Sequence, residues 1–254
     1  MVKILFHHVP KTGGTSIINH FSSLFPEEEV WSTEFFERER KFLMESSGKK
    51  GITYKDYRWE FYFEKFSFIA DHLNMIEVAP QGIVKFAFLR DPVQRTLSQY
   101  RDWRRLTIDD IKHQPPVAQE AKLAAKGLNI WEFLEVDNRP LKVNFHNLQC
   151  KSFLLGVEND EKVNAYSDDE LLSRAVAVAE KLDFVGFTEE MLKCLNVFLM
   201  RVGFEKIKSI QHLNRTEENL ELSARDLEAI KRFNQADIAL YKKYRDKFEE
   251  EHLA

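Results

Sequence analysis

The chain has 254 residues, of which 44% are hydrophobic and 31% charged, and its formal net charge is −4. This is the composition of an ordinary globular protein, and the negative charge argues against a nucleic-acid-binding domain, which usually carries a strong positive excess. Two cysteines, Cys150 and Cys194, are too few for a disulfide framework or a usual zinc site and suit a reduced, cytoplasmic setting. No apolar run approaches the roughly 20 residues that span a bilayer, so we expect no membrane span.

The first strand and the first helix are predicted on either side of a short loop. Residues 3–9, KILFHHV, form an apolar run that stops at Pro10, which favours a buried strand. Residues 15–25 then place large apolar side chains on one face at helical spacing, which predicts a helix. Residues 31–65 are rich in charged and aromatic side chains and are expected to form helices or a cover over a sheet, with a loop at 46–51.

Strands and helices continue to alternate along the rest of the chain. Further strands are predicted at residues 66–70, 83–89 and 183–188, and further helices at residues 93–106, 117–135 and 189–202. This alternation favours a parallel sheet. We therefore expect an α/β fold with a P-loop-like parallel β-sheet flanked by helices, in which residues 1–254 form a single domain with helical additions.

One long helix is predicted at the end of the chain, from about Ala224 to Phe248, with Ser223 as its N-cap. Its apolar face is interrupted by two polar residues, Asn234 and Asp237. Buried polar groups require hydrogen-bond partners, so we expect these two side chains to form a structural hydrogen-bonded pair.

The loop after the first strand has the composition of an anion site. A helix N-terminus presents unpaired amide groups and the positive end of its dipole, and two successive glycines allow the backbone to curl around a phosphate. A lysine and three hydroxyls add further donors. The residues expected to hold the anion are Lys11, Thr12, Gly13, Gly14, Thr15 and Ser16. The segment is not a Walker A motif, because Lys11 precedes both glycines instead of following the last one.

A second candidate anion site follows the strand at 83–89. Arg90 stands at the carboxyl end of that strand, where open α/β sheets bind ligands, and its planar guanidinium suits a phosphate. Ser98, two turns into the next predicted helix, can point back at the same group. An ion pair between Arg90 and Asp91 or another acid is the alternative for this segment.

Together these segments resemble the PAPS-dependent sulfotransferases, and more closely the branch that contains the glycan (heparan/uronyl) 2-O-sulfotransferases and their bacterial relatives. The matching segments, in the order of the family, are HVPKTGGTS (8–16), FAFLRDPVQRTLSQY (86–100), NLQCKSFLLG (147–156), DFVGFTEE (183–190), HLNRTEENL (212–220) and NQADIALYKKY (234–244). The first two are specific in combination, and the others support them.

The resemblance implies a donor, 3′-phosphoadenosine 5′-phosphosulfate (PAPS), and the product 3′,5′-ADP (PAP). The loop at 8–16 would hold the 5′-phosphosulfate, with Lys11 near the bridging oxygen. Arg90 and Ser98 would hold the 3′-phosphate. Arg215 and Thr216, together with Asn214, match a family loop that closes over the nucleotide. The partners implied are the nucleotide and an acceptor hydroxyl on a glycan or a small molecule.

A catalytic base is expected at His72, which occupies the position of the base in the glycan 2-O-sulfotransferases. The family has Gly before this histidine and this chain has Asp71, which is expected to orient His72 or raise its basicity. His7 and His8 are rivals by position, although strand packing suits both better. Lys11 is the second catalytic residue, because it can stabilise the leaving phosphate, and no divalent metal is expected.

Two other functions are compatible with parts of this sequence. One is a P-loop kinase or NTPase that uses Mg·ATP, with Asp71 as a magnesium ligand at the end of a strand. The other is a non-enzymatic nucleotide-binding or glycan-binding module. The acceptor is expected to be a carbohydrate hydroxyl by resemblance alone, and the basic residues within 101–126 are better explained as a solvated helical face than as a cleft for an anionic sugar. The aromatic residues at 31–66 could instead line a pocket for a lipid or an aromatic alcohol.

Overall fold

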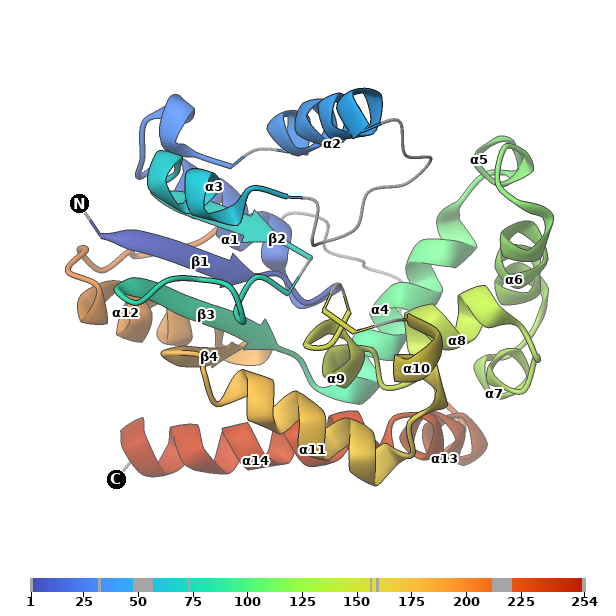
Figure 1. Cartoon of the computed structure of the whole chain (residues 1–254). Helices are drawn as coiled ribbons and strands as arrows, with labels where there is room; N and C mark the ends of the chain where they lie inside the picture. The colour runs from blue at the N-terminus through green and yellow to red at the C-terminus, as the bar shows by residue number, and fades with distance from the viewer. Residues whose placement is uncertain are drawn as a thin grey trace.

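The computed structural model describes residues 2–31, 33–47, 57–72, 74–155, 157–158, 160–211 and 221–252. Within them a parallel sheet of four strands has the order β2-β1-β3-β4. Its strands are β1 (Lys3–His7), β2 (Phe68–Asp71), β3 (Ile83–Leu89) and β4 (Phe184–Phe187). The α/β fold with a P-loop-like parallel sheet is therefore confirmed, and each strand lies within about two residues of its predicted position (Figure 1).

Stacked phenylalanine rings form the core on one face of this sheet. Phe6 and Phe86 project from β1 and β3, with ring centroids 4.7 Å apart. Phe21 of α1 (Gly14–Ser22) and Phe198 of α12 (Met191–Arg201) pack onto them, and the Phe86 and Phe198 centroids are 4.2 Å apart. The 21 phenylalanines of the sequence thus serve mainly to fill a wide interior. This packing fixes the start of α1 against the sheet.

The opposite face of the sheet is covered by aromatic residues from the segment between β1 and β2. Leu5 and Ile69 on this face pack with Trp31 and with Tyr62 and Phe63 of α3 (Trp59–Lys65). A further helix, α2 (Thr33–Ser47), lies above α3 in Figure 1. The expectation that 31–65 covers the sheet is therefore confirmed for the residues that are described.

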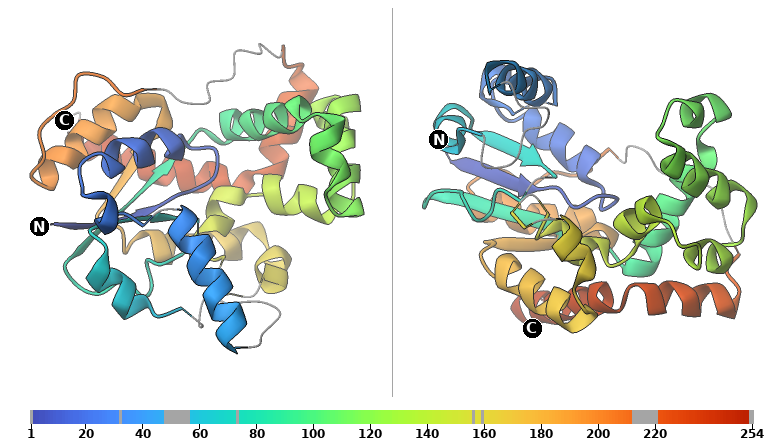
Figure 2. Two further views of the ribbon diagram at one scale, coloured as in Figure 1. Left: turned by 90° about the horizontal axis from the view of Figure 1, so that it is seen from above. Right: turned by 45° about the vertical axis from the view of Figure 1, so that its right-hand side comes forward.

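A second hydrophobic core lies beyond the carboxyl ends of the strands, among helices alone (Figure 2). Its helices are α4 (Pro92–Arg105), α6 (Pro116–Gly127), α7 (Ile130–Leu134), α8 (Arg139–Phe145) and α13 (Ala224–Phe233), with α5 (Ile108–Lys112) at its edge. Tyr100, Trp103, Phe133 and Phe145 fill it. This is the expected helical addition, and α4 joins it to the sheet.

Among the described residues, the remaining helical segments contribute no buried residue to the second core. They are the 3₁₀ turns η1 (Glu27–Glu29) and η3 (Thr188–Glu190), and the helices α9 (Leu148–Ser152), α10 (Asp160–Ala165), α11 (Asp168–Ala179) and α14 (Gln235–His252). Helices α11 and α14 pack side by side below the sheet in Figure 1.

The prediction of one continuous terminal helix is wrong. Ser223 does cap α13, in a capping box with Asp226, but the helix ends at Asn234, whose φ and ψ of −133° and 39° are not helical. The Asn234 side chain instead accepts a hydrogen bond from the Asn147 amide at 3.2 Å and donates one to the Thr96 hydroxyl at 3.2 Å. These tertiary contacts hold the break. The helix predicted at 117–135 is also interrupted, because Asn129 begins α7 with a new capping box.

Candidate active site

The loops after β1 and β3 meet at the carboxyl edge of the sheet. The two strands pair in register from Lys3↔Ile83 to His7↔Ala87, so their ends lie next to each other. The chain places β2 on one side of β1 and β3 on the other. In open α/β sheets such a reversal of strand order leaves a crevice in which ligands bind. Both predicted anion-binding segments therefore lie where the topology provides a site.

Two backbone features shape the loop between β1 and α1. Lys11 and Gly13 have positive φ values of 69° and 82°, so the chain curls twice within three residues. Gly13 is the N-cap of α1 and provides no side-chain hydrogen bond to it. The Ser16 amide donates to the Gly13 carbonyl at 3.1 Å, whereas the Gly14 and Thr15 amides have no hydrogen-bond partner among the described residues, which is the arrangement that binds an anion.

Gly14 is required for a different reason, the close approach of a neighbouring ring. A Cβ atom on Gly14 would lie only 2.0 Å from the imidazole of His8. The His8 ring is in turn stacked between Phe6 and His72, with centroid distances of 5.6 and 4.1 Å. The glycine pair thus combines one left-handed residue with one residue that must lack a side chain.

The hydroxyls of the loop differ in where they point. The Thr12 hydroxyl is fully buried and donates to the Val9 carbonyl at 2.8 Å, so it braces the loop from within. Ser16 is also buried, whereas Thr15 is exposed at the first turn of α1. Any contribution of Thr12 to anion binding therefore comes from its backbone amide.

Lys11 reaches the second segment through a surface ion pair. Its Nζ lies 3.2 Å from Asp102 Oδ2 on α4, and the Lys11 and Asp102 side chains are 26% and 53% exposed. Ion pairs this exposed contribute little to stability. An incoming anion with a higher charge can therefore displace Asp102 from the lysine.

Arg90 is brought into contact with the loop itself. Its Nη1 donates to the Lys11 carbonyl at 3.1 Å, so the alternative of a simple pair with Asp91 does not describe it. Burial lowers the pKa of Arg90, while the nearby carboxylate of Glu189 opposes that shift and the guanidinium of Arg101 adds to it. The Asp91 carboxylate instead caps α4 by accepting from the Gln94 amide at 2.9 Å.

The open face of α4 carries the remaining polar groups. Ser98, Arg101 and Asp102 have the i, i+3, i+4 spacing that places side chains on one helix face, and the opposite face is buried in the helical core. Since Asp102 contacts Lys11, this face is turned towards the loop. Ser98 is therefore placed on the side of α4 that faces Arg90 and Lys11, as its predicted role requires.

His72 lies directly against the loop. Its Nδ1 is 2.7 Å from the carbonyl of His8, which can only accept a hydrogen bond, so Nδ1 carries the proton and Nε2 keeps its lone pair. The side chain is exposed. The geometry thus leaves one imidazole nitrogen free to accept a proton at the mouth of the site.

The hydrogen bond that orients His72 does not come from Asp71. A main-chain carbonyl orients His72, and the Asp71 carboxylate accepts a hydrogen bond from the indole nitrogen of Trp31 at 3.2 Å. The carboxylate is engaged there because Trp31 packs under β2 as part of the aromatic cover.

The two neighbouring histidines pack in the sheet, as expected. His7 is buried with its ring 5.0 Å from that of Phe153. Burial, together with the adjacent His72 and His7, lowers the pKa of His8 to about 3. His8 therefore stays neutral near pH 7 and is a poor candidate for a catalytic base.

Comparison with known protein families identifies the class of this site. The profile of the sulfotransferase family matches residues 2–249. The chain belongs to the sulfotransferase family. No curated protein matches it in sequence at a significant level. The match covers both the parallel sheet and the helical addition, so the crevice described above belongs to a sulfotransferase-family fold.

Two residues that the sequence alone did not indicate connect the parts of this candidate site. The Thr188 hydroxyl, just after β4, lies 2.8 Å from the Thr12 carbonyl and 3.1 Å from the Leu89 carbonyl. The Gln149 side chain accepts from the Arg90 amide at 2.9 Å and donates to its carbonyl at 2.8 Å. Both lie within family-like segments, but only their position at the sheet edge could have indicated a role.

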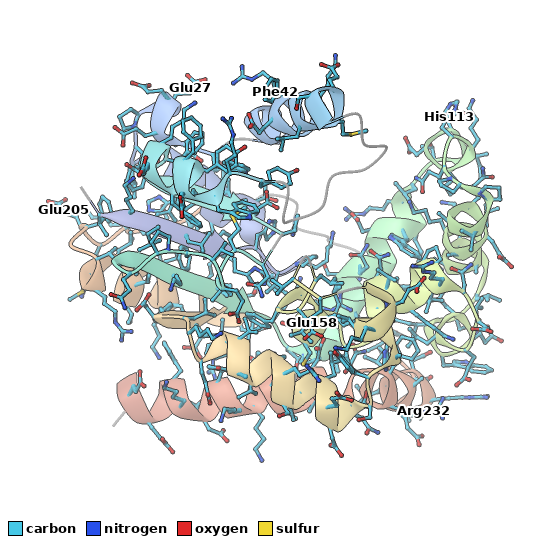
Figure 3. All side chains as sticks on the ribbon, in the orientation of Figure 1. Glu27, Phe42, His113, Glu158, Glu205 and Arg232 are labelled. Carbon is cyan, nitrogen blue, oxygen red and sulfur yellow. The ribbon has the colours of Figure 1, made fainter. Side chains whose placement is uncertain are left out.

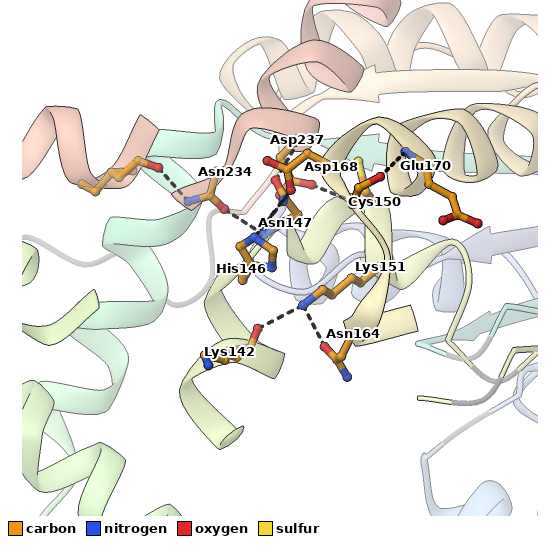
Figure 4. A network of polar contacts seen from close by, with 12 residues as sticks. Lys142, His146, Asn147, Cys150, Lys151, Asn164, Asp168, Glu170, Asn234 and Asp237 are labelled. Carbon is orange, nitrogen blue, oxygen red and sulfur yellow. Dashed lines mark hydrogen bonds and ion pairs between the residues drawn. The ribbon is translucent and has the colours of Figure 1, made fainter. Parts of the chain in front are cut away.

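Gln149 is held in place by a buried polar network around Asp237. Figure 4 shows this network at Asn147, Cys150, Asn234 and Asp237. The Asp237 carboxylate accepts hydrogen bonds from the Gln149 and Cys150 amides at 3.0 and 2.8 Å, at the start of α9. Asn234 and Asn147 flank this contact. Asn234 and Asp237 are therefore structural, as expected, but their partners are groups at the start of α9 and on α4 instead of each other.

The basic residues within 101–126 mostly serve the helical addition. Lys126 donates to the carbonyls of Arg104 and Leu106 at its surface, and the Lys122 ammonium lies over the Trp103 ring. His113 lies at the outer tip of this part, away from the sheet edge (Figure 3). Of the other predicted site residues, Arg215 and Thr216 lie outside the described part of the chain. No helix in that part is long and apolar enough to cross a membrane.

Proposed function

We propose that this protein transfers a sulfuryl group from 3′-phosphoadenosine 5′-phosphosulfate to an acceptor hydroxyl, and that residues 1–254 act as one sulfotransferase domain. Membership of the sulfotransferase family supports the reaction class. The observation that carries the choice of donor is the 3.1 Å contact between Arg90 Nη1 and the Lys11 carbonyl. It joins two cationic, anion-binding segments in one site, as a nucleotide with phosphate groups at both ends requires.

The glycine loop fits the phosphosulfate end of such a donor. A cation, Lys11, adjoins uncapped amides at the start of α1, and the space at Gly14 would be filled by any Cβ atom. Residues 11–16 would hold the 5′-phosphosulfate, with Lys11 at the oxygen that leaves. Arg90 and Ser98 would hold the 3′-phosphate, and Arg215 and Thr216 would cover the nucleotide.

The transfer step follows from the position of His72. The acceptor oxygen forms a bond to sulfur while its proton passes to Nε2 of His72, and the bond between sulfur and the bridging oxygen breaks. The product 3′,5′-ADP leaves with an additional negative charge on its 5′-phosphate. Lys11 and the loop amides stabilise that charge, so this scheme uses no metal ion.

A carbohydrate hydroxyl is the acceptor that we propose. The support is the likeness of residues 8–16 and 86–100 to the glycan 2-O-sulfotransferases. The test is incubation with labelled donor and a panel of oligosaccharides, phenols and alkyl alcohols. We expect label on an oligosaccharide, and transfer only to phenols or alcohols would replace this acceptor class while keeping the reaction.

A kinase is the main rival, and the two functions separate in a thermal-shift experiment. A magnesium-dependent kinase needs a carboxylate such as that of Asp71 for its metal, but this group accepts from the Trp31 indole. We expect 3′,5′-ADP to raise the melting temperature and Mg·ATP to leave it unchanged, because a ligand stabilises only the fold that binds it. Stabilisation by Mg·ATP alone would favour the kinase. Binding of 3′,5′-ADP without transfer to any acceptor would favour a binding module.

A further inference from the structure

Arg101 on α4 is a cationic residue for which the mechanism above gives no role. Its guanidinium makes no hydrogen bond or ion pair among the described residues, and its Nε is shielded from solvent without a partner. Other partly unsatisfied arginines differ, because Arg95 donates to the Asn144 and Phe145 carbonyls and Arg245 pairs with Glu190. Shielded donors are almost always paired in folded proteins, so an orphan of this kind calls for a partner outside the chain.

The surroundings of Arg101 point to an anion as that partner. The Arg101 guanidinium is close enough to Arg90 to lower the pKa of Arg90, and no carboxylate among the described residues pairs with Arg101. The carboxylate of the next residue, Asp102, forms an ion pair with Lys11 at 3.2 Å. Arg90 and Arg101 therefore repel each other, and that repulsion is relieved when a doubly charged group binds to both.

The spacing of residues on α4 indicates which phosphate end of the donor lies near Arg101. Arg101 follows Ser98 by three residues, so both lie on the same open face of the helix. Arg90, at the end of β3, faces the same region. Its guanidinium contacts the glycine loop only at the Lys11 carbonyl, at the start of that loop. We propose that Arg101 is a third ligand of the nucleotide's terminal 3′-phosphate, acting with Arg90 and Ser98, and that it sets the preference for nucleotides carrying this group. This assignment rests on the proposed function.

The test compares two nucleotides by calorimetry in the full chain. The variants are Arg101→Ala and Arg101→Lys, and the matched control is Arg105→Ala, which removes the same charge from an exposed position on the same helix. We expect Arg101→Ala to weaken the binding of 3′,5′-ADP by about tenfold to a hundredfold, the effect of losing a charge-assisted hydrogen bond. Adenosine 5′-phosphate, which lacks the 3′-phosphate, should bind all variants alike, and Arg101→Lys should recover part of the loss.

The stability of the ligand-free variant provides an independent check. Because Arg101 has no partner in the described part of the chain, its removal should not lower the melting temperature of the free protein, which a structural role would require. Equal weakening of both nucleotides, or none, would overturn the role of Arg101. Failure of the unmodified protein to bind 3′,5′-ADP would instead overturn the proposed function.

Discussion

His72 shows how a single hydrogen bond can prepare a base without a carboxylate. The His8 carbonyl fixes the proton on Nδ1, because a carbonyl can only accept, and Nε2 is left to face solvent. The orientation therefore comes from the same backbone that forms the start of the anion loop. Base and loop are coupled geometrically at residues 8 and 72.

Replacement of His72 by Ala should lower turnover by about 10²-fold or more, the usual effect of losing a general base. Binding of 3′,5′-ADP should change little, because the side chain lies at the mouth of the site. Steady-state sulfation assays and calorimetry on the same preparation separate the two effects. His113→Ala is the control, since that histidine is exposed on the far tip of the helical addition. Near-normal turnover in His72→Ala would remove the assignment.

Gly14 is sensitive to a single added methyl group because of a neighbouring side chain. A Cβ atom there would meet the His8 ring at 2.0 Å, so that ring would have to shift away from its stacking contacts with Phe6 and His72. Gly14→Ala should lower the free energy of unfolding by about 1–3 kcal/mol, as overpacking usually does. It should also weaken the binding of 3′,5′-ADP, because it displaces the loop. Gly127→Ala is the matched control, because open space surrounds Gly127. Urea denaturation with a binding assay measures both effects, and an unchanged affinity would argue against the loop as the anion site.

At the scale of elements, a short helix is held by a distant carboxylate. Helix α9 has five residues and cannot be stable alone, and the Asp237 carboxylate accepts from two amides at its start. Gln149 on this helix then clamps the backbone of Arg90. The position of the guanidinium therefore depends on α14, although Arg90 and Asp237 are far apart in sequence.

Truncation of Asp237 should be strongly destabilising. Asp237→Ala leaves two buried amides without partners, at about 1–3 kcal/mol each, so we expect a loss of about 2–5 kcal/mol in the free energy of unfolding. Asp246→Ala removes an exposed carboxylate from the same helix and should be near neutral. Chemical denaturation followed by circular dichroism measures both. Equal effects of the two variants would show that the cap at α9 carries no stability.

These elements also show what the sequence could predict. The strands and the glycine loop were found because apolar runs bounded by Pro10 and Asp91 are local signals. The break at Asn234 and the placement of Gln149 could not be predicted, because contacts between residues almost 90 positions apart create them. The orientation of His72 was assigned to its neighbour Asp71, whereas the His8 carbonyl from an adjacent strand provides it.

At the scale of the whole molecule, α4 links the sheet to the helical addition and carries site residues along its open face. The helix begins next to Arg90 at the sheet edge and ends in the second core at Trp103. Because α4 directly follows β3 and its apolar side packs in the second core, one continuous segment joins the sheet to that core. Their folding is expected to be coupled through this helix.

The stability of the whole fold should rise with pH between about 4 and 6.5. Burial is the largest cause that lowers the pKa of His8 to about 3 and that of His146 to about 4, so both are neutral in the folded chain where the unfolded chain, with a histidine pKa near 6.5, is protonated. The unfolded state then binds more protons in this window, and each histidine contributes up to about 1.4 kcal/mol per pH unit, lost as the pH falls. Urea denaturation at pH 5 and 7 measures the difference. His146→Gln should reduce it and His113→Gln, at an exposed site, should not. A difference that is the same in both variants would mean that burial of His146 does not govern this response.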